Sequence, residues 1–453
     1  MDLDSAALYK QPPPSFGHDV LKYFAFDPAY TNLNNGMNSS TTIPRLDPPS
    51  HTHNVRFLGS YGATPLPVLS AVNKLTLQVE ANPDHFHRLA YQPLLIDVRR
   101  RLAQLIGADT DEVVLVANAS LGINTVLRNF EWEKGDTIIA CKYTVNTTYG
   151  SINKTVRNIG DVRPHPTVEQ FVVQFPTTHA QIIASFKEFI AAHPTAEGKK
   201  TVVVIDSIIS NPGVLLPWKE LAAICKEVGA WSVIDAAHSI GQEVDINLSE
   251  AQPDFWVSNC HKWLSAKRAV AVLYVPKRNQ HIVKSSIPTS HTYISPVDRL
   301  DPNFVAQFEW NGTIDFTPYL SVSSALDFRN WLGGEHKINE YCHKLAIQGG
   351  KVLAEVMGTR VLDPDGDLTV NMVSYIVPFQ LPFPGNFLPT EEIEIKLKTK
   401  MLEEHKAYSA HFYHNGRWWT RCSAQVWNEV EDFENIGKAW LVVCAEVLKE
   451  LEK

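Results

Sequence analysis

Residues 231–242 of the chain read WSVIDAAHSIGQ, and residues 255–264 read FWVSNCHKWL. Each segment opens on a short apolar run and continues into side chains that can carry chemistry: Asp235 and His238 in the first, Lys262 in the second. Short apolar runs rich in β-branched and aromatic residues are typical of buried strands. Ligands of a parallel sheet bind at the carboxyl ends of its strands. The two segments therefore predict a functional site at one edge of such a sheet.

Further apolar runs occur on both sides of these two segments. They cover residues 113–116, 137–140, 202–205 and 270–275, and helix-like stretches separate several of them, among them residues 121–130 and 218–228. Apolar strands that alternate with helices are typical of parallel βαβ units whose sheet is buried on both faces. We therefore predict an α/β fold with a mainly parallel sheet between helices, in a large domain that spans residues 61–320.

The two ends of the chain have a different pattern. Residues 1–60 begin with an arm that contains three consecutive prolines and continue into a segment rich in Asn, Ser, Thr and Pro, which is typical of loops. Residues 321–453 combine long helical patterns with short strand-like runs. We expect a smaller C-terminal α+β domain there, completed by the N-terminal arm.

The composition limits the class of protein. The 453 residues carry 41 Lys and Arg against 49 Asp and Glu, a formal net charge of −8, which argues against a general nucleic-acid binder. The longest apolar run in the second half, residues 269–275, is too short to span a membrane. Six cysteines without a CxxC pair and a start unlike a signal peptide favour a cytoplasmic protein without a structural zinc site. The alternating pairs His51/His53 and His85/His87 lack the accompanying Cys or carboxylate spacing of a zinc site, so we expect no metal.

A third strand end adds an anion-binding element. Ala117-Asn118-Ala119-Ser120-Leu121-Gly122 follows the run at residues 113–116, and small residues that open a helix expose backbone N–H groups to an anion. Taken alone, each of these features has a simpler interpretation: Ser120 as an N-cap, His238 as a buried polar residue, and Lys262 as a lysine reaching solvent. Together they supply the phosphate cradle, the acid and the lysine that pyridoxal phosphate (PLP) requires.

With these elements together, the chain resembles the class V aminotransferase family of fold-type I PLP enzymes. The resemblance rests on residues 233–242 and 258–264, in this order, and extends from about residue 32 to residue 430. Further segments resemble a fungal branch that contains the ergothioneine-pathway C–S lyase, loline-type cyclising enzymes and isopenicillin N epimerase-like proteins. These segments are residues 26–30, 117–125, 278–281 and 423–426.

The resemblance implies a role for each matching residue. Lys262 would hold the cofactor's aldehyde and move the Cα proton, Asp235 would pair with the pyridine nitrogen, and Tyr149 would stack on the ring and act as an acid. The remaining cofactor contacts surround the phenolic oxygen and the phosphate. They are Ser210, His238, Ala119, Ser120, Leu121, Ser258, His261 and, from the neighbouring subunit of a homodimer with shared active sites, Thr313.

The substrate side is also implied by the resemblance. Arg421 would bind the α-carboxylate, while Asn35 and Gly36 lie where the family places its substrate-side segment, with Asn35 where histidine is common. Arg417 precedes Arg421 by four residues and would share its face on a strand, where it contacts either a second anionic group of the substrate or only solvent and a surface acid.

We expect C–S bond cleavage by β-elimination on a cysteine conjugate or its sulfoxide. Cysteine desulfurases of the family carry a nucleophilic cysteine on a loop that precedes the carboxylate-binding arginine. Residues 381–400 contain no cysteine, so a desulfurase that carries a persulfide there is disfavoured. Burial also makes a reactive thiolate at Cys260 less favourable. The alternatives are a PLP-dependent cyclase, epimerase or decarboxylase of fungal secondary metabolism, then a transaminase, and outside catalysis a binding protein with the PLP fold.

Overall fold

The computed structural model describes most of the chain. The described residues are 4–27, 30–34, 62–143, 146–147, 150–284, 287–289, 292–295, 297–298, 303–363, 368–369, 375–377, 390–414 and 417–451.

An eight-stranded sheet forms the centre of the described large domain. Its strand order is β2-β9-β8-β7-β6-β3-β4, with β5 on the other side of β3. The pairs β3–β5, β3–β6, β6–β7 and β7–β8 are parallel, whereas β9 runs antiparallel to both β2 and β8. The predicted mainly parallel sheet is thus confirmed. The strands are β2 Val113–Val116, β3 Thr137–Tyr143, β4 Asn146–Thr147, β5 Thr167–Val173, β6 Thr201–Asp206, β7 Trp231–Asp235, β8 Phe255–Asn259 and β9 Ala271–Tyr274.

Both faces of this sheet are buried because its strands alternate apolar side chains between two cores. Val203 and Ile205 of β6 belong to one core, and Val202 and Val204 belong to the other. Helices α4, α7, α8 and α11 contribute to the first core, and α5 and α6 cover the second. This alternation explains why the strands read as continuous apolar runs in the sequence. The helices of the large domain are α2 Leu66–Ala81, α3 Pro83–His85, η2 Phe86–Ala90, α4 Tyr91–Ile106, η3 Thr110–Glu112, α5 Ala119–Asn129, α6 Gly150–Asp161, α7 His179–Ala192, α8 Trp218–Glu227, α9 Leu248–Ala251, η4 Lys277–Asn279, α10 Ala306–Glu309 and α11 Thr317–Trp331.

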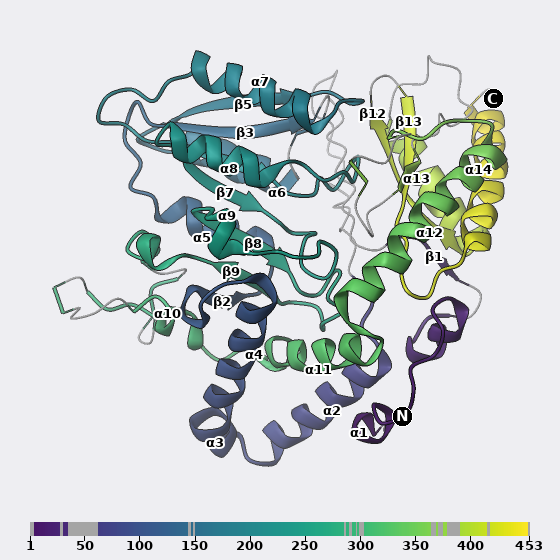
Figure 1. Cartoon of the computed structure of the whole chain (residues 1–453), viewed down its shortest axis with the longest axis horizontal. Coiled ribbons are helices and arrows are strands. Elements are labelled where there is room, and N and C mark those ends of the chain that lie inside the picture. The colour runs from purple at the N-terminus through teal and green to yellow at the C-terminus, as the bar shows by residue number, and fades with distance from the viewer. Residues whose placement is uncertain are drawn as a thin grey trace.

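The smaller unit is built on a three-stranded antiparallel sheet in the order β10-β13-β12, with α12 and α14 beside it. Figure 1 shows the large sheet on the left and this unit on the right, with both marked chain ends on the right-hand side. Its elements are α12 Gly334–Met357, β10 Tyr375–Val377, α13 Glu391–Thr399, η5 Lys400–Glu404, β11 Ala407–Tyr408, β12 Ala410–His414, β13 Arg417–Cys422 and α14 Val430–Leu451.

The long helical pattern near the start of residues 321–453 is divided between two helices, α11 and α12. The break between α11 and α12 lies at Gly333, whose φ of +114° is open to glycine but strained for other residues. The expected domain boundary at residues 320/321 falls inside α11, and the chain changes direction about a dozen residues later.

The N-terminal arm packs against the C-terminal unit. It contains α1 Ser5–Leu8, η1 His18–Tyr23 and β1 Thr31–Asn32, and β1 pairs in parallel with β11. The N–H of Gly17 donates to the carbonyl of Val426 at 2.8 Å, and the His18 ring lies 3.2 Å from Asp432. Residues from the two ends of the chain thus build one unit.

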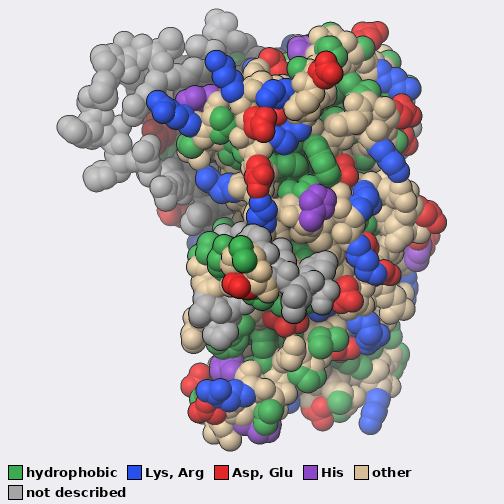
Figure 2. Space-filling model, turned by 90° about the vertical axis from the view of Figure 1, so that its left-hand side faces the viewer, with side chains coloured by type: hydrophobic (Ala, Val, Ile, Leu, Met, Phe, Trp, Pro, Cys, Tyr) green, Lys and Arg blue, Asp and Glu red, His purple; other side chains and the backbone are tan. Residues whose placement is uncertain are grey.

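The distribution of charged side chains and the length of the described helices both agree with what the composition suggests. On the face drawn in Figure 2, Lys and Arg side chains are interspersed with Asp and Glu. None of the described helices is both long enough and apolar enough to cross a membrane.

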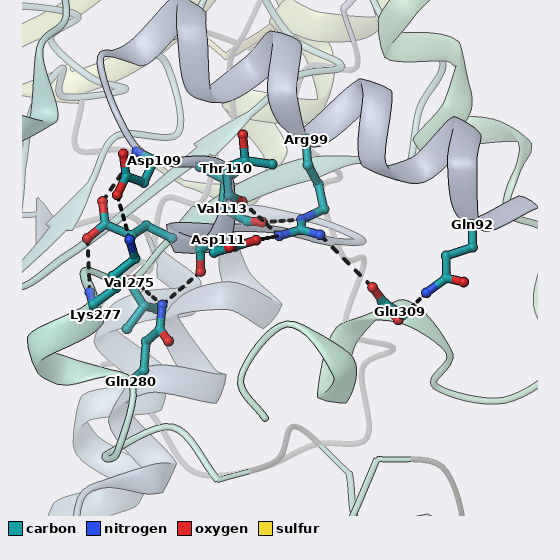
Figure 3. A network of polar contacts seen from close by, with 11 residues as sticks. Gln92, Arg99, Asp109, Thr110, Asp111, Val113, Val275, Lys277, Gln280 and Glu309 are labelled. Atoms are coloured by element: carbon teal, nitrogen blue, oxygen red, sulfur yellow. Dashed lines mark hydrogen bonds and ion pairs between the residues drawn. The ribbon is translucent and has the colours of Figure 1, made fainter. Parts of the chain in front are cut away.

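Arg99 is a buried cation that links α4 to the start of the sheet. Figure 3 shows its guanidinium reaching toward the loop before β2 and toward α10. It donates to the carbonyls of Val113 and Thr110, both at 2.7 Å, and lies 3.2 Å from a carboxylate oxygen of Asp111 and 4.0 Å from one of Glu309. The side chain is only 4% exposed. One buried residue therefore bonds the backbone at the start of β2 and lies close to two carboxylates.

Replacing Arg99 with alanine should destabilise the protein by about 3 kcal/mol, because it removes the donor to the buried carbonyl of Val113 and a buried side chain. Arg100→Ala is the matched control, since the Arg100 side chain is 58% exposed in its pair with Asp97 and should contribute below about 1 kcal/mol. Urea unfolding followed by circular dichroism measures both. Equal midpoints for the two variants would contradict the assigned role of Arg99.

Candidate active site

Three strands end at the same edge of the large sheet. Val116, the last residue of β2, and Asn259, the last residue of β8, both lie opposite Ala271 of β9. Asp235, the last residue of β7, lies opposite Val257 of β8. The residues that follow these strand ends are therefore neighbours in space, as the sequence predicts.

Lys262, His238 and Asp235 are buried together at this edge. The Nζ atom of Lys262 lies 3.0 Å from Nε2 of His238. Burial lowers the pKa of Lys262 to about 8, although the charge of Asp235 opposes the shift. Burial also raises the pKa of Asp235, and the charge of Lys262 counteracts it. Burial thus brings the pKa of the lysine closer to neutral pH and increases the fraction of the neutral, nucleophilic amine.

The peptide around Lys262 is clamped by close backbone contacts. Gly241 has a φ of +81°, and a Cβ on it would lie 2.7 Å from the carbonyl carbon of Trp263. A Cβ on Gly62 would lie 1.9 Å from the carbonyl oxygen of His261. Glycine at both positions lets two chain segments approach the backbone beside the lysine closely.

Arg329 of α11 bonds the backbone on both sides of this close contact between Trp263 and Gly241. Its guanidinium donates to the carbonyls of Trp263, at 2.9 Å, and Gly241, at 2.8 Å, and forms a two-pronged ion pair with Glu335 of α12. Sequence reasoning missed Gly62, Gly241 and Arg329, because only a structure shows which distant backbone each one meets.

The N-terminus of α5 is partly occupied by side chains of the protein itself. The Oδ1 atom of Asn118 accepts from the N–H of Leu121, and Oδ1 of Asn259 accepts from the N–H of Ala119, both at 2.9 Å. These are two of the backbone donors that the resemblance assigns to a phosphate. Among the described residues, none makes a hydrogen bond to the N–H or hydroxyl of Ser120 that would compete with an anion. Of the three residues expected to bind the phosphate at this helix N-terminus, Ser120 therefore has the donors that remain open to it.

Ser258 and His261 are also engaged within the protein. The hydroxyl of Ser258 donates to the carbonyl of Ala236 at 2.5 Å and accepts from the N–H of Ile240 at 3.0 Å. A bond from this hydroxyl to a phosphate would require it to release Ala236. The Nδ1–H of His261 donates to the carbonyl of Val270 at 2.8 Å, which leaves Nε2 for another partner.

Arg421 reaches the same site from β13 of the small unit. It is fully buried, donates to the carbonyl of Ser210 at 2.6 Å, and lies 3.4 Å from Oδ1 of Asn34. Its Nε atom has no hydrogen-bond partner among the described residues. Its charge lowers the pKa of both Lys262 and His238. A buried fork with a vacant donor next to the lysine suits a carboxylate.

The remaining predicted residues fall into two groups. Thr313 is exposed in the loop before α11, and Arg417 is exposed at the start of β13, four residues from the buried Arg421. Tyr149, Asn35 and Gly36 lie outside the described residues. Asn34, the residue before Asn35, lies 3.4 Å from Arg421.

The chemistry of the donor set fits PLP. Burial disfavours the charged carboxylate of Asp235, and the protonated pyridine nitrogen would supply a cation that stabilises it. The amine of Lys262 would bond the aldehyde carbon, and the helix N-terminus at Ser120 would meet the phosphate. In the described part of the chain, no group of three His, Cys, Asp or Glu side chains is arranged to hold a metal ion.

Comparisons with known proteins agree with this arrangement. Residues 62–382 match the Aminotransferase class-V family. The chain is 33% identical to the L-cysteine desulfhydrase-like protein lolT1 of Epichloe uncinata, over 96% of this chain and 97% of the relative. It is 28% identical to hercynylcysteine sulfoxide lyase of Schizosaccharomyces pombe, over 95% and 98% of the two chains.

The fold also matches a solved structure. The apo cysteine desulfurase of Thermococcus onnurineus NA1 superimposes with a TM-score of 0.70 at 18% identity, covering 96% of this chain and 100% of the other. The resemblance seen in the sequence is confirmed: the chain belongs to the class V aminotransferase family and has the fold-type I architecture of its members.

Proposed function

We propose that the protein is a PLP-dependent C–S lyase that acts by β-elimination on a cysteine conjugate or its sulfoxide. The observation that carries the proposal is the meeting of Lys262, Asp235 and Arg421 in one buried site: an amine with a pKa of about 8, a carboxylate and a vacant guanidinium donor. The names of the relatives, a desulfhydrase-like protein and a sulfoxide lyase, support the same bond.

Each side chain has a task in this reaction. When bound, PLP withdraws electrons from Cα of the amino acid and so makes its proton acidic. Arg421 holds the α-carboxylate and thereby orients Cα above Lys262, whose amine takes the proton. Asp235 would hold the protonated ring nitrogen, and His238 would hold the phenolic oxygen. The Cβ–S bond breaks, the sulfur group leaves, and water converts the remaining dehydroalanine into pyruvate and ammonia.

The cysteines argue against sulfur transfer through the protein. All six are buried and unpaired by disulfides. Burial raises the pKa of Cys260 and of Cys422 to about 12, so neither presents a thiolate at neutral pH. With no cysteine in residues 381–400, sulfur is expected to leave with the product.

The proposed assembly is a cytoplasmic homodimer with shared active sites. Thr313 supports this idea, because it is exposed in a loop where the resemblance places a contact to the neighbour's phosphate. Sedimentation of the purified protein at several concentrations tests the dimer.

Incubation with S-alkyl-cysteine sulfoxides should release pyruvate and ammonia in equal amounts. Alanine, which has no leaving group on Cβ, is the matched control: it should exchange its Cα proton for deuterium and release no pyruvate. Exchange or inversion at Cα of the sulfoxides without pyruvate would replace the lyase proposal with an epimerase. A ring-closed product would replace it with a cyclase.

A further inference from the structure

His238 lies between two residues that are adjacent in the chain. Its Nε2 atom is 3.0 Å from Nζ of Lys262, and its Nδ1 atom is 3.1 Å from the indole Nε1 of Trp263. The exposed fractions are 2% for His238, 7% for Lys262 and 0% for Trp263. A buried chain of two hydrogen bonds, centred on His238, thus links the loop after β7 to the turn after β8.

The donor inventory determines where the protons in this chain lie. An indole N–H can only donate, so Nδ1 of His238 must accept and carries no hydrogen. A neutral imidazole then carries its one hydrogen on Nε2. That N–H points at Lys262 and can bond only to a nitrogen lone pair. This arrangement therefore favours the neutral amine over the ammonium form, because an ammonium group would meet a second donor.

The surroundings act on the amine in both directions. Asp235 favours its charged form, whereas burial and the charge of Arg421 oppose it, and together they place the pKa of Lys262 at about 8. Burial and the charges of Lys262, Arg421 and His261 lower the pKa of His238. The ring therefore does not gain a second proton near neutral pH, and its tautomer depends on which nitrogen finds a donor.

We propose that Trp263 is a positioning residue that holds His238 in the Nε2–H tautomer and so keeps the amine of Lys262 in the neutral form that captures the cofactor. The proposal deepens the function proposed above and rests on it only for the identity of the group captured. Without the indole N–H, the hydrogen of His238 moves to Nδ1, Nε2 becomes an acceptor, and a protonated Lys262 donates to it.

The consequence is measurable before any cofactor is bound. Removing the indole donor should raise the pKa of Lys262 in the cofactor-free protein by about one unit, which is about tenfold less neutral amine at neutral pH. Trace labelling with acetic anhydride across a pH series, read as modification of the Lys262 peptide by mass spectrometry, gives this pKa directly.

Two variants separate the donor from the shape of the side chain. Trp263→Phe removes the N–H and part of the volume. Incorporation of benzothienylalanine at position 263 replaces the N–H with sulfur and keeps the bicyclic shape. Trp440→Phe is the matched control, since the Trp440 indole is equally buried and donates to the Ser409 hydroxyl at 2.8 Å in the C-terminal unit.

A higher pKa of Lys262 in both position-263 variants, with the Trp440→Phe value unchanged, supports the proposal. An unchanged pKa in the benzothienylalanine protein overturns it, because the shape alone would then suffice. A separate reading tests the function: borohydride treatment of the PLP-loaded protein should attach the cofactor at Lys262. Its absence there would reject the proposed function while leaving the titration result valid.

Discussion

Replacing Lys262 with alanine is expected to lower the elimination rate about a thousandfold or more and to abolish covalent capture of PLP. The amine is the only lysine nitrogen among the described residues that is placed against both His238 and the charge of Asp235. Loss of a positioned proton acceptor alone costs about 10²- to 10⁴-fold, and loss of the covalent bond adds to it. Pyruvate release and the visible absorption band of the loaded protein measure the two effects.

Lys267→Ala provides the control for this substitution. Lys267 lies five residues further along the same segment, but its side chain is 37% exposed and 4.0 Å from Asp315. It should retain both the absorption band and full activity. A Lys262→Ala protein that kept the band would show that another group holds the cofactor.

Arg421→Met should lower kcat/KM about a thousandfold for amino-acid substrates, mainly through KM. A substrate carboxylate that enters this buried site without its fork remains desolvated and unpaired, which costs about 4 kcal/mol. A substrate with a carboxamide in place of the carboxylate isolates the interaction. The variant and the parent protein should process that analogue at similar rates, because neither forms an ion pair with it.

Arg417→Met tests the second arginine of the same strand. Arg417 is exposed whereas Arg421 is fully buried. If Arg417 binds only solvent and surface acids, its loss should change kcat/KM less than about threefold. A much larger effect that appears only with substrates bearing a second anionic group would assign Arg417 to the substrate.

The sequence predicts those parts of the fold and site that depend on local pattern. Asp235 ends one buried apolar strand, and Lys262 follows another. His238, which follows the first strand, contacts Lys262 because the two parallel strands end at the same edge. The edge strand β5 and helices α6 and α7 are less evident, since β5 is only partly buried and mixes polar with apolar residues.

Contacts between distant segments could not be predicted from local pattern. Asn259 occupies the N–H of Ala119 across 140 positions, and Arg329 reaches Gly241 across 88. Each depends on the rotamer and register of two elements at once. The small residues at 117–122 predict the start of a helix, and α5 begins at Ala119, but local pattern does not show that Asn118 and Asn259 bond two of its N–H groups.

The pairing of β1 with β11 has a consequence for synthesis of the chain. Thr31 and its partner Ala407 are separated by 376 positions. At about 5–20 residues per second, the ribosome needs roughly 20–80 s to deliver the second strand after the first. During that interval the large sheet can already fold, and the N-terminal arm can contact α11, while β1 still lacks the strand with which it pairs. Asn34 comes shortly after β1, and Arg421 lies in β13, which is synthesised after β11. The part of the site where Asn34 and Arg421 meet is therefore assembled last.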